Sequence, residues 1–362
     1  MKASNDPALL RLIEQVLTAR DAQQSLEIRG GGTKDFYGGP RQGEPLDVRP
    51  LCGISSYEPS ELVVTARAGT PLAELERILA ARGQCLPFEP PRFGEGGTVG
   101  GMVAAGLSGP ARAAVGCVRD YVLGVTLLNG ECQVLTFGGQ VMKNVAGYDV
   151  SRALAGSMGV LGVILEVSLK VLPSPTAQAT LAYEMEQAQA LSWLNGLTRQ
   201  PLPVNASCWH DGRLLLRLCG AQAAVESARN RLGGELLPDD RAAASWSALR
   251  DQQHQFFADA RAAGERIWRL SLPAVTPALS LPGETLIEWG GAQRWLRSGA
   301  PTTELRAAAA QCGGHATLFH GAAADEAVFT RLDPIQMRLQ QQLKAAFDPH
   351  GLFNRGRLYP EF

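Results

Sequence analysis

Glycine and threonine gather in three short clusters between residues 29 and 164. The clusters are residues 29–34 (RGGGTK), residues 96–101 (GGTVGG) and residues 156–164 (GSMGVLGVI). Backbone without side chains turns its N–H groups outward at close range, which is how a protein cradles a phosphate group. Three such clusters indicate one long ligand with a diphosphate that touches the protein at several points. The candidate is a flavin dinucleotide.

Two other phosphate-binding patterns do not fit this sequence. A Rossmann fingerprint places its G-x-G-x-x-G turn directly before an amphipathic helix, but residues 34–40 (KDFYGGP) cannot open such a helix. A P-loop needs G-x-x-x-x-G-K-[ST], and neither Lys34 nor Lys143 is placed in that way. The remaining alternative is that the glycines serve only tight turns and close packing. Three clusters in this order favour a ligand over that alternative.

The second cluster carries a physical argument of its own. Residues 98–106 (TVGGMVAAG) are typical of a loop that enters a helix of small residues. Free N–H groups and the positive end of the helix dipole would then point at a diphosphate. We therefore expect this loop to complete the phosphate cradle.

Composition narrows the class of protein. The length of 362 residues suggests two domains, or three, and the formal net charge of −1 gives no reason to expect nucleic acid or an anionic membrane as partner. Seven widely spaced cysteines without a C-x-x-C pair argue against a disulfide framework, a zinc site and an iron–sulfur cluster. We find neither an apolar run of about 20 residues nor signal-peptide features. We therefore expect a cytoplasmic protein, tethered to a membrane only through a partner.

The elements that must position the clusters follow from periodicity. Helical spacing of apolar residues predicts a helix over 7–20, and an Asn-Gly turn at 129–130 predicts a hairpin of strands 121–128 and 132–137. Further strands are expected at 26–29, 62–66 and 160–171, with a helix from residue 70 to 79. The proline pair in residues 172–175 (LPSP) is the best domain boundary.

Beyond this boundary, strands and helices alternate. The pattern predicts a split β-α-β sheet with helices on one face, and hence an α+β fold. A final helix over 336–347 precedes a glycine-rich tail. We predict a first domain over 1–173, a cap domain over 174–330, and a C-terminal segment, 331–362, that returns to the first domain.

The clusters resemble those of the FAD-binding oxidases of the vanillyl-alcohol oxidase and p-cresol methylhydroxylase (PCMH) type, and are most similar to the FAD-binding E subunits of bacterial glycolate oxidases. The resemblance covers residues 26–173 and 347–360, and its most specific stretches are residues 97–101, 143–149 (KNVAGYD) and 156–164. It implies a PCMH-type FAD-binding domain of two α/β subdomains with a ferredoxin-like α+β cap.

The resemblance also implies which positions contact FAD. The first two loops would hold the diphosphate, the segment 116–120 would run beside the cofactor, and the strand at 159–164 would meet the adenine or the flavin ring. Arg357 would bring a positive charge toward the pyrimidine edge of the flavin, the alternative being a salt bridge at a domain edge. The implied positions are Gly30, Gly31, Gly32, Thr33, Lys34, Gly97, Thr98, Val99, Gly100, Gly101, Gly116, Arg119, Asp120, Gly159, Gly162, Val163, Ile164 and Arg357.

Two departures from the family pattern shape the expected chemistry. Some relatives bond FAD to a histidine in the first loop, whereas this chain has Thr33 and Lys34 there. We therefore expect FAD without a covalent link. The metal-binding histidine cluster of catalytic D-2-hydroxyacid dehydrogenases is reduced to His315 and His320, five residues apart on a strand and so on opposite faces. We expect no metal site and assign no catalytic residue.

The resemblance implies a subunit of a complex that oxidises glycolate to glyoxylate. Its partners would be a second FAD-containing subunit and an iron–sulfur subunit, with the main catalysis on the sister flavoprotein. Two alternatives stay open: a self-sufficient FAD-dependent oxidase of another 2-hydroxy acid or alcohol, and a non-catalytic structural flavoprotein subunit.

Overall fold

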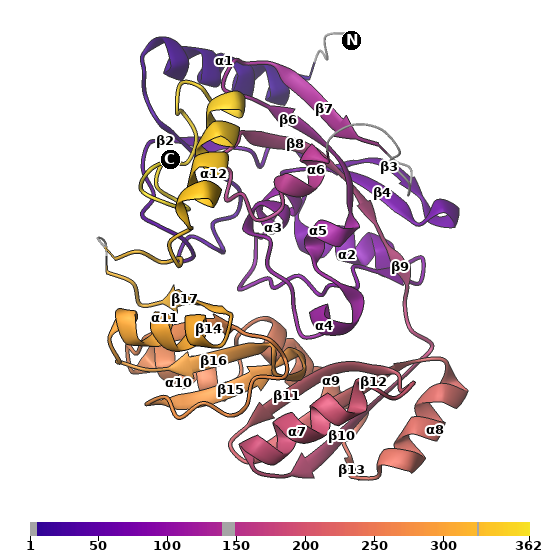
Figure 1. Ribbon diagram of the computed structural model, residues 1–362. Helices are drawn as coiled ribbons and strands as arrows, with labels where there is room; N and C mark the ends of the chain where they lie inside the picture. The colour runs from indigo at the N-terminus through magenta and orange to yellow at the C-terminus, as the bar shows by residue number, and fades with distance from the viewer. Residues whose placement is uncertain (1–5, 140–148, 324–325) are drawn as a thin grey trace.

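The computed structural model describes residues 6–139, 149–323 and 326–362. An antiparallel sheet forms the centre of the first region, shown in the upper half of Figure 1. Its five described strands lie in the order β3-β4-β8-β6-β7. Their bounds are β3 Ile54–Glu58, β4 Val63–Arg67, β6 Val122–Leu128, β7 Val134–Gly138 and β8 Val163–Lys170. The predicted hairpin around residues 129–130 is confirmed by the antiparallel pairing of β6 with β7.

Helices and turns cover this sheet. Helix α2 (Leu72–Ala80) buries leucines at positions 72, 75 and 79, and the short helix α3 (Val99–Ala105) packs beside it in one apolar core. Between them and along the sheet edges lie η1 Pro59–Glu61, α4 Arg112–Val115, α5 Val118–Tyr121, α6 Val150–Ala153, and the paired two-residue strands β5 Gln84–Cys85 and β9 Leu172–Pro173. The glycine-rich second cluster therefore begins α3 against a packed core.

Residues 7–47 and the C-terminal tail meet in a small second layer. Helix α1 (Pro7–Asp21) agrees with the predicted opening helix, and β1 (Leu26–Arg29) pairs in parallel with β2 (Glu44–Asp47). The tail joins this sheet through a bridge between Leu26 and Phe353. Leu352 and Phe353 are both fully buried in the same core as α1. The C-terminal tail is thus part of the N-terminal architecture.

A larger antiparallel sheet fills the second region. Its eight described strands lie in the order β13-β10-β12-β11-β15-β16-β14-β17. Their bounds are β10 Ala177–Glu184, β11 Val204–His210, β12 Arg213–Gly220, β13 Glu235–Leu236, β14 Ile267–Ser271, β15 Glu284–Glu288, β16 Gln293–Arg297 and β17 His315–His320. β12 lies between β10 and β11, and β14 lies between β16 and β17. Because β10 in turn lies between β12 and β13, the described sheet holds three split β-α-β units, as the α+β pattern predicted.

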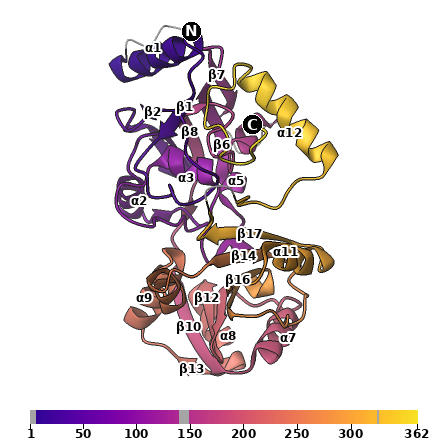
Figure 2. The same cartoon turned by 90° about the vertical axis from the view of Figure 1, so that its left-hand side faces the viewer.

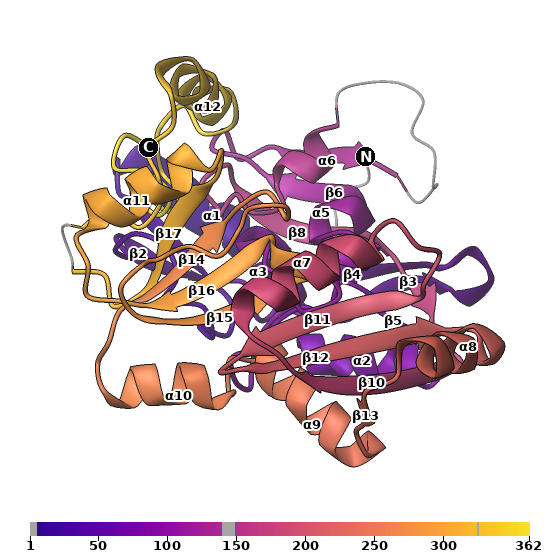
Figure 3. The same ribbon diagram turned by 60° about the horizontal axis from the view of Figure 1, so that its bottom comes forward.

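Helices cover both faces of this sheet, whereas the sequence predicted one face. The helices α7 Gln187–Leu197, α8 Gln222–Leu232 and α11 Thr302–Gln311 pack on one side, and α9 Asp239–Arg250 and α10 Gln255–Ala262 share the core of the other. Figure 3 shows α7 and α11 on the near side of the strands, with α9 and α10 below them. The one-turn η2 (Trp289–Gly291) joins β15 to β16. The face with α9 and α10 is the one that meets the first region.

The last helix, α12 (Pro334–Phe347), lies beside the first region (Figure 2). Buried Lys344 donates from its Nζ to the carbonyl oxygens of Val160 (2.7 Å) and Phe353 (2.9 Å), and pairs with the carboxylate of Asp348 at 2.7 Å. Burial lowers the pKa of Lys344, and Asp348 opposes that shift. This buried pair fastens α12 to the third glycine cluster. In the described part of the chain, no helix combines the length and apolarity needed to cross a membrane.

Candidate functional site

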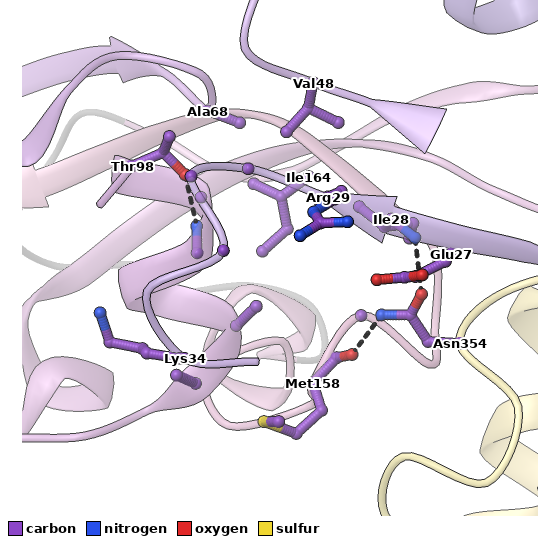
Figure 4. A pocket seen from close by; sticks show the side chains of 18 of the residues that line it. Glu27, Ile28, Arg29, Lys34, Val48, Ala68, Thr98, Met158, Ile164 and Asn354 are labelled. Atoms are coloured by element: carbon purple, nitrogen blue, oxygen red, sulfur yellow. Dashed lines mark hydrogen bonds between the residues drawn. The ribbon is translucent and has the colours of Figure 1, made fainter. Parts of the chain in front are cut away.

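A cleft of about 850 Å³, counted with the open solvent space at its mouth, lies in the first region. It lies among the first glycine loop, the start of α3, the third cluster and the C-terminal tail (Figure 4). The predicted positions that line it are Gly30, Gly31, Gly32, Thr33, Lys34, Thr98, Gly100, Gly101, Gly159, Gly162, Ile164 and Arg357. All three clusters therefore converge on one cavity.

The first loop presents its backbone to this cavity. Within the described residues, the N–H groups of residues 31–34 donate to no protein acceptor. The loop needs glycine because a Cβ on Gly30 would lie 2.5 Å from the hydroxyl oxygen of Thr98, and a Cβ on Gly31 would overlap the carbonyl of Gly96. Free N–H groups on a loop without side chains form a concavity that binds anions. This loop fits a diphosphate.

The second cluster offers fewer free N–H groups than the sequence predicted: within the described residues those of residues 96–98 donate to no protein acceptor, whereas those at the start of α3 are paired. The N–H of Val99 donates to the Thr70 carbonyl at 2.9 Å, and that of Gly100 donates to the Ala68 carbonyl at 2.8 Å. The N–H of Gly101 reaches the Thr98 hydroxyl at 3.2 Å, because Thr98 is the N-cap of α3. Two carbonyls of the turn that follows β4 and the N-cap hydroxyl thus satisfy the first N–H groups of α3. Gly100 and Gly101 form a wall of the cavity, and free donors remain in the first loop and at residues 96–98, just before α3.

Backbone of the third cluster forms the opposite wall. Gly159 and Gly162 have φ angles of 77° and 144°, which favour glycine. Ile164 faces the cavity, while its strand neighbour Val163 is fully buried in another core, as alternation along β8 requires. The amide of Asn354 joins this wall to β1, because its Nδ2 donates to the Met158 carbonyl at 2.6 Å and its Oδ1 accepts from the Ile28 N–H at 2.7 Å.

Arg357 lines the cavity, but its guanidinium is occupied. It donates to the backbone carbonyls of Gly39 (2.5 Å) and Tyr37 and lies 3.5 Å from that of Asp35. The side chain is buried, and this burial lowers the pKa of Arg357. The alternative of a surface salt bridge is therefore wrong. Arg357 clamps the tail to the segment that follows the first loop.

Two cations of the described lining, Lys34 and Arg357, have no carboxylate within ion-pair distance, and of these only Arg357 donates to backbone carbonyls. The Nζ of Lys34 lies 3.4 Å from the Thr33 hydroxyl and 5.5 Å from the centre of the Phe93 ring. Burial lowers the pKa of Lys34 to about 8, and the charge of Asp251 opposes this shift. Figure 4 shows Lys34 and Asn354 at opposite ends of the lining side chains. A buried ammonium of this kind gains stability from any anion that enters the cavity.

Opposite charges pair at another part of the wall. Arg29 contacts Asp35 at 2.9 Å, and Arg41 bridges Asp35 (2.7 Å) and Glu27 (3.0 Å). All four side chains line the cavity and all are partly exposed. This network fixes the position of the segment around Asp35.

Six of the predicted positions lie outside the described lining: Gly97, Val99, Gly116, Arg119, Asp120 and Val163. The segment 116–120 instead folds on itself, with the Cys117 N–H donating to the Asp120 carboxylate at 2.8 Å and Arg119 reaching the Ala155 carbonyl at 3.3 Å. The specific stretch 143–149 falls almost entirely on residues 140–148, outside the described residues.

Sequence reasoning missed several lining positions. They are Glu27, Ile28, Arg29, Asp35, Arg41, Val48, Ala68, Ala104, Ala105, Met158 and Asn354. Arg29, Ala104 and Met158 lie within the recognised stretches 29–34, 98–106 and 156–164, so assigning every residue of each stretch to the site would have found them. Asn354 has a weaker signal: it stands in the tail at a φ of 46°, a conformation that asparagine tolerates better than most residues.

The histidines lie elsewhere. His315 and His320 occupy the two ends of β17, and the His320 ring stacks on Phe36 at 4.1 Å. None of the described residues that line the cavity is a histidine. A search of the described residues finds no group of three or more His, Cys, Asp or Glu side chains placed to hold a metal ion.

Comparisons with known proteins agree with this geometry. Residues 11–155 match the family described as FAD binding domain, and residues 290–358 match the C-terminal domain of FAD linked oxidases. The chain is 47% identical to glycolate oxidase subunit GlcE of Escherichia coli over 97% of each chain. It is 30% identical to glycolate oxidase subunit GlcD of Bacillus subtilis over 45% of this chain and 35% of that protein.

The fold has a counterpart among solved structures. An alkyldihydroxyacetonephosphate synthase superposes with a TM-score of 0.62 at 14% identity, covering 95% of this chain and 74% of the other. At this identity the likeness concerns the fold alone, and it agrees with the PCMH-type architecture that the sequence predicted. The family match, the near full-length likeness and the converging glycine loops lead to one assignment. The chain is an FAD-binding member of the FAD-linked oxidases and belongs to the family of glycolate oxidase subunit GlcE.

Proposed function

We propose that this chain is the FAD-binding subunit of a glycolate oxidase complex, which oxidises glycolate to glyoxylate. The observation that carries the proposal is the first loop, whose residues line the cavity and whose N–H groups at residues 31–34 donate to no described protein acceptor. The near full-length likeness to a glycolate oxidase subunit supports the choice of substrate. FAD, when bound, would supply a carrier for the electrons that the complex removes from its substrate.

The residues of the chain would hold the cofactor in defined ways. The N–H groups of residues 31–34 would bind the diphosphate, and the ammonium of Lys34 would add a positive charge to the same cavity. Asn354 keeps β1 and the third cluster at a fixed separation, which sets the width of the cavity. Arg357 holds the segment 35–39 in place. A site whose side chains are locked by such contacts binds with a smaller entropic cost.

We propose that the FAD is held without a covalent bond. Some members of the oxidase superfamily use a histidine of the first loop for a covalent link, and this chain has Thr33 and Lys34 there. The described lining of the cavity includes no histidine elsewhere. The contacts available to the cofactor are therefore hydrogen bonds, charge and packing.

We propose further that the main oxidation takes place on a second FAD-containing subunit, with an iron–sulfur subunit receiving the electrons. His315 and His320 lie at opposite ends of one strand, so they do not form the paired ligands of the catalytic relatives. In this arrangement the flavin of this chain relays electrons or stabilises the complex. The assembly would be cytoplasmic, or peripheral to the inner membrane through its partners.

The experiment compares the chain alone with the complex. Glycolate-dependent reduction of an artificial dye should be negligible for the chain alone and should appear when both partner subunits are co-expressed with it. The partners without this chain form the control and should also be inactive. Brisk oxidation of glycolate by the isolated chain would overturn the accessory role and favour a self-sufficient oxidase. Full activity of the partners alone would overturn the requirement for this chain.

A further inference from the structure

Helix α12 presents an apolar face to solvent. Five large apolar side chains are exposed among the described residues, and only two of them, Ile335 and Leu339, belong to the same element. They are 65% and 59% exposed, and their spacing of one helical turn makes them neighbours on the helix surface. Single exposed apolar residues are ordinary in folded proteins, whereas neighbouring ones indicate an interaction surface.

The spacing along α12 shows that this face points directly away from the core of the first region. Successive residues of an α-helix are about 100° apart, so the buried residues Met337 and Lys344 share one side. The outer side of a helix at the protein surface ordinarily carries polar and charged residues. On α12 the outer side is mostly apolar instead. Its exposed residues, opposite the two buried ones, are Ile335, Leu339, Gln342 and Ala346.

Charge is nearly absent from the exposed surface of α12. Between residues 334 and 347 the sequence has no aspartate or glutamate, and Lys344 is buried in its pair with Asp348. Arg338 is the exposed charged residue of the helix, and the ion pairs of the described residues do not include it. Protein interfaces are poor in lysine, glutamate and aspartate and enriched in arginine. The composition of α12 therefore indicates a surface that binds another protein.

The helix is held in place without a partner. Its N-cap, Asp333, accepts from the N–H groups of Ile335 (2.9 Å) and Gln336 (3.0 Å), and Pro334 occupies its first turn. Near its other end, Lys344 fixes it to the first region. Figures 2 and 3 both show α12 at the edge of the molecule. A helix that is already ordered loses little conformational entropy on binding.

Charge also distinguishes among the possible occupants of this face. In a two-fold contact between copies of this chain, the Arg338 side chains of both copies would lie on the same flank of the helix pair. Because α12 has no carboxylate to offset them, like charges oppose such a contact. A helix on a membrane surface has many cations together with large apolar or aromatic side chains. Among its exposed residues, α12 has one cation and no aromatic side chain.

We propose that α12 is a docking helix, whose outer side enters an apolar groove of a partner protein with a carboxylate opposite Arg338. A helix bound in a groove places apolar anchors at intervals of three or four residues, and Ile335 and Leu339 supply them. The identification of the partner as a subunit of the glycolate oxidase complex rests on the proposed function. Because Lys344 of the same helix holds the Val160 carbonyl of the third cluster, the partner would contact the element that supports the cofactor cavity.

The test co-expresses the tagged full chain with the second FAD-containing subunit and the iron–sulfur subunit, and measures how much of each subunit the chain retains. FAD content and urea denaturation show that each variant is folded. The double variant Ile335→Gln/Leu339→Gln should lower the retention of a partner subunit by about tenfold or more, because it removes both apolar anchors. Val275→Gln is the matched control and should retain the subunits as the parent does, since Val275 is 75% exposed but lies in the loop after β14.

Two variants of Arg338 test the expected carboxylate of the partner. Arg338→Glu should lower retention more than Arg338→Gln, because it sets two negative charges against each other. High salt should reduce the difference between these variants. Equal retention by both variants at low salt would overturn the carboxylate in the groove.

Retention of both subunits by the double variant at the level of the parent would overturn the docking surface and leave the proposed function standing. Two further measurements use the chain alone: sedimentation at high concentration, and flotation with vesicles of phosphatidylcholine and phosphatidylglycerol. Self-association or vesicle binding that the double variant abolishes would assign the face to a second copy or to a membrane, and would overturn the proposal. If the parent chain carries FAD but retains neither subunit, the proposed complex and this docking surface both fail.

Discussion

Gly31 and Gly96 meet backbone to backbone, so closely that a Cβ on Gly31 would overlap the carbonyl oxygen of Gly96. This contact joins the first two glycine clusters, which are far apart in the sequence. It fixes the loop that lines the cofactor cavity and whose N–H groups at residues 31–34 have no described protein acceptor. The glycines of the two clusters thus have different roles: some leave backbone N–H groups free to donate, and others allow the two loops to approach closely.

Gly31→Ala should expel FAD and destabilise the fold, because the added methyl group forces the two loops apart. An overpacked site of this kind costs about 1–3 kcal/mol. Gly97→Ala is the matched control, since its Cβ would meet its nearest neighbour, the Thr33 hydroxyl, at an ordinary 3.4 Å. The flavin-to-protein absorbance ratio and urea denaturation measure both effects. Equal FAD content in the two variants would contradict the close contact.

Gly101→Asp tests charge in the cavity more cleanly than Gly100→Asp. A Cβ on Gly100 would lie 2.7 Å from the Cβ of Ala68, whereas at Gly101 the nearest atom is the Thr98 hydroxyl at 3.2 Å. Gly101→Asp should reduce FAD affinity because its carboxylate repels the diphosphate. Gly101→Asn has the same shape without the charge and should retain more of the FAD affinity. FAD binding can be followed by fluorescence quenching. If the Asn variant loses as much affinity as the Asp variant, steric conflict alone explains the loss.

Lys34 makes FAD affinity depend on pH. Because burial lowers the pKa of this ammonium from 10.5 to about 8, the folded chain without ligand loses the proton at lower pH than the unfolded chain. The free-energy cost of burying the charge of Lys34 in the folded chain is therefore fully present below pH 8 and disappears as pH rises toward 10.5. An anion bound nearby raises the pKa of Lys34, so that binding takes up a proton above pH 8.

FAD affinity should consequently fall by about tenfold between pH 7.5 and pH 9.5. Lys34→Met should bind FAD more weakly at pH 7.5 and should show a flat profile across this range. Titrations of the apoprotein with FAD at each pH give the profile. A pH dependence that survives in Lys34→Met would assign it to another group.

Lys344→Met should destabilise the protein by about 3 kcal/mol, because it leaves the carboxylate of Asp348 buried without its cation. The loss should also lower FAD retention, since Lys344 holds the carbonyl of Val160 in the third cluster. Arg338→Met removes an exposed charge from the same helix and should change the unfolding free energy by less than about 0.5 kcal/mol. Urea denaturation compares the two, and similar midpoints would show that the buried pair is not a stabilising clamp.

Local sequence pattern was sufficient for some of these features. The Asn129-Gly130 turn specifies its hairpin through neighbouring residues, and the run of three glycines predicts a loop with exposed N–H groups. The pairing of the first N–H groups of α3 could not be predicted in this way, because their acceptors, the carbonyls of Ala68 and Thr70, belong to a distant part of the chain. Asn354 bridges Ile28 and Met158 from the far end of the sequence. Contacts made by folding across hundreds of residues leave no local signal.

Acid precipitation of the purified full chain tests the central claim most directly. We predict a yellow protein that releases its colour into the supernatant, where chromatography identifies FAD at about one molecule per chain. This result follows from a cavity with free N–H donors and no histidine in its described lining. Colour that stays with the precipitate would contradict non-covalent binding, and a colourless protein that does not take up added FAD would contradict the cofactor site itself.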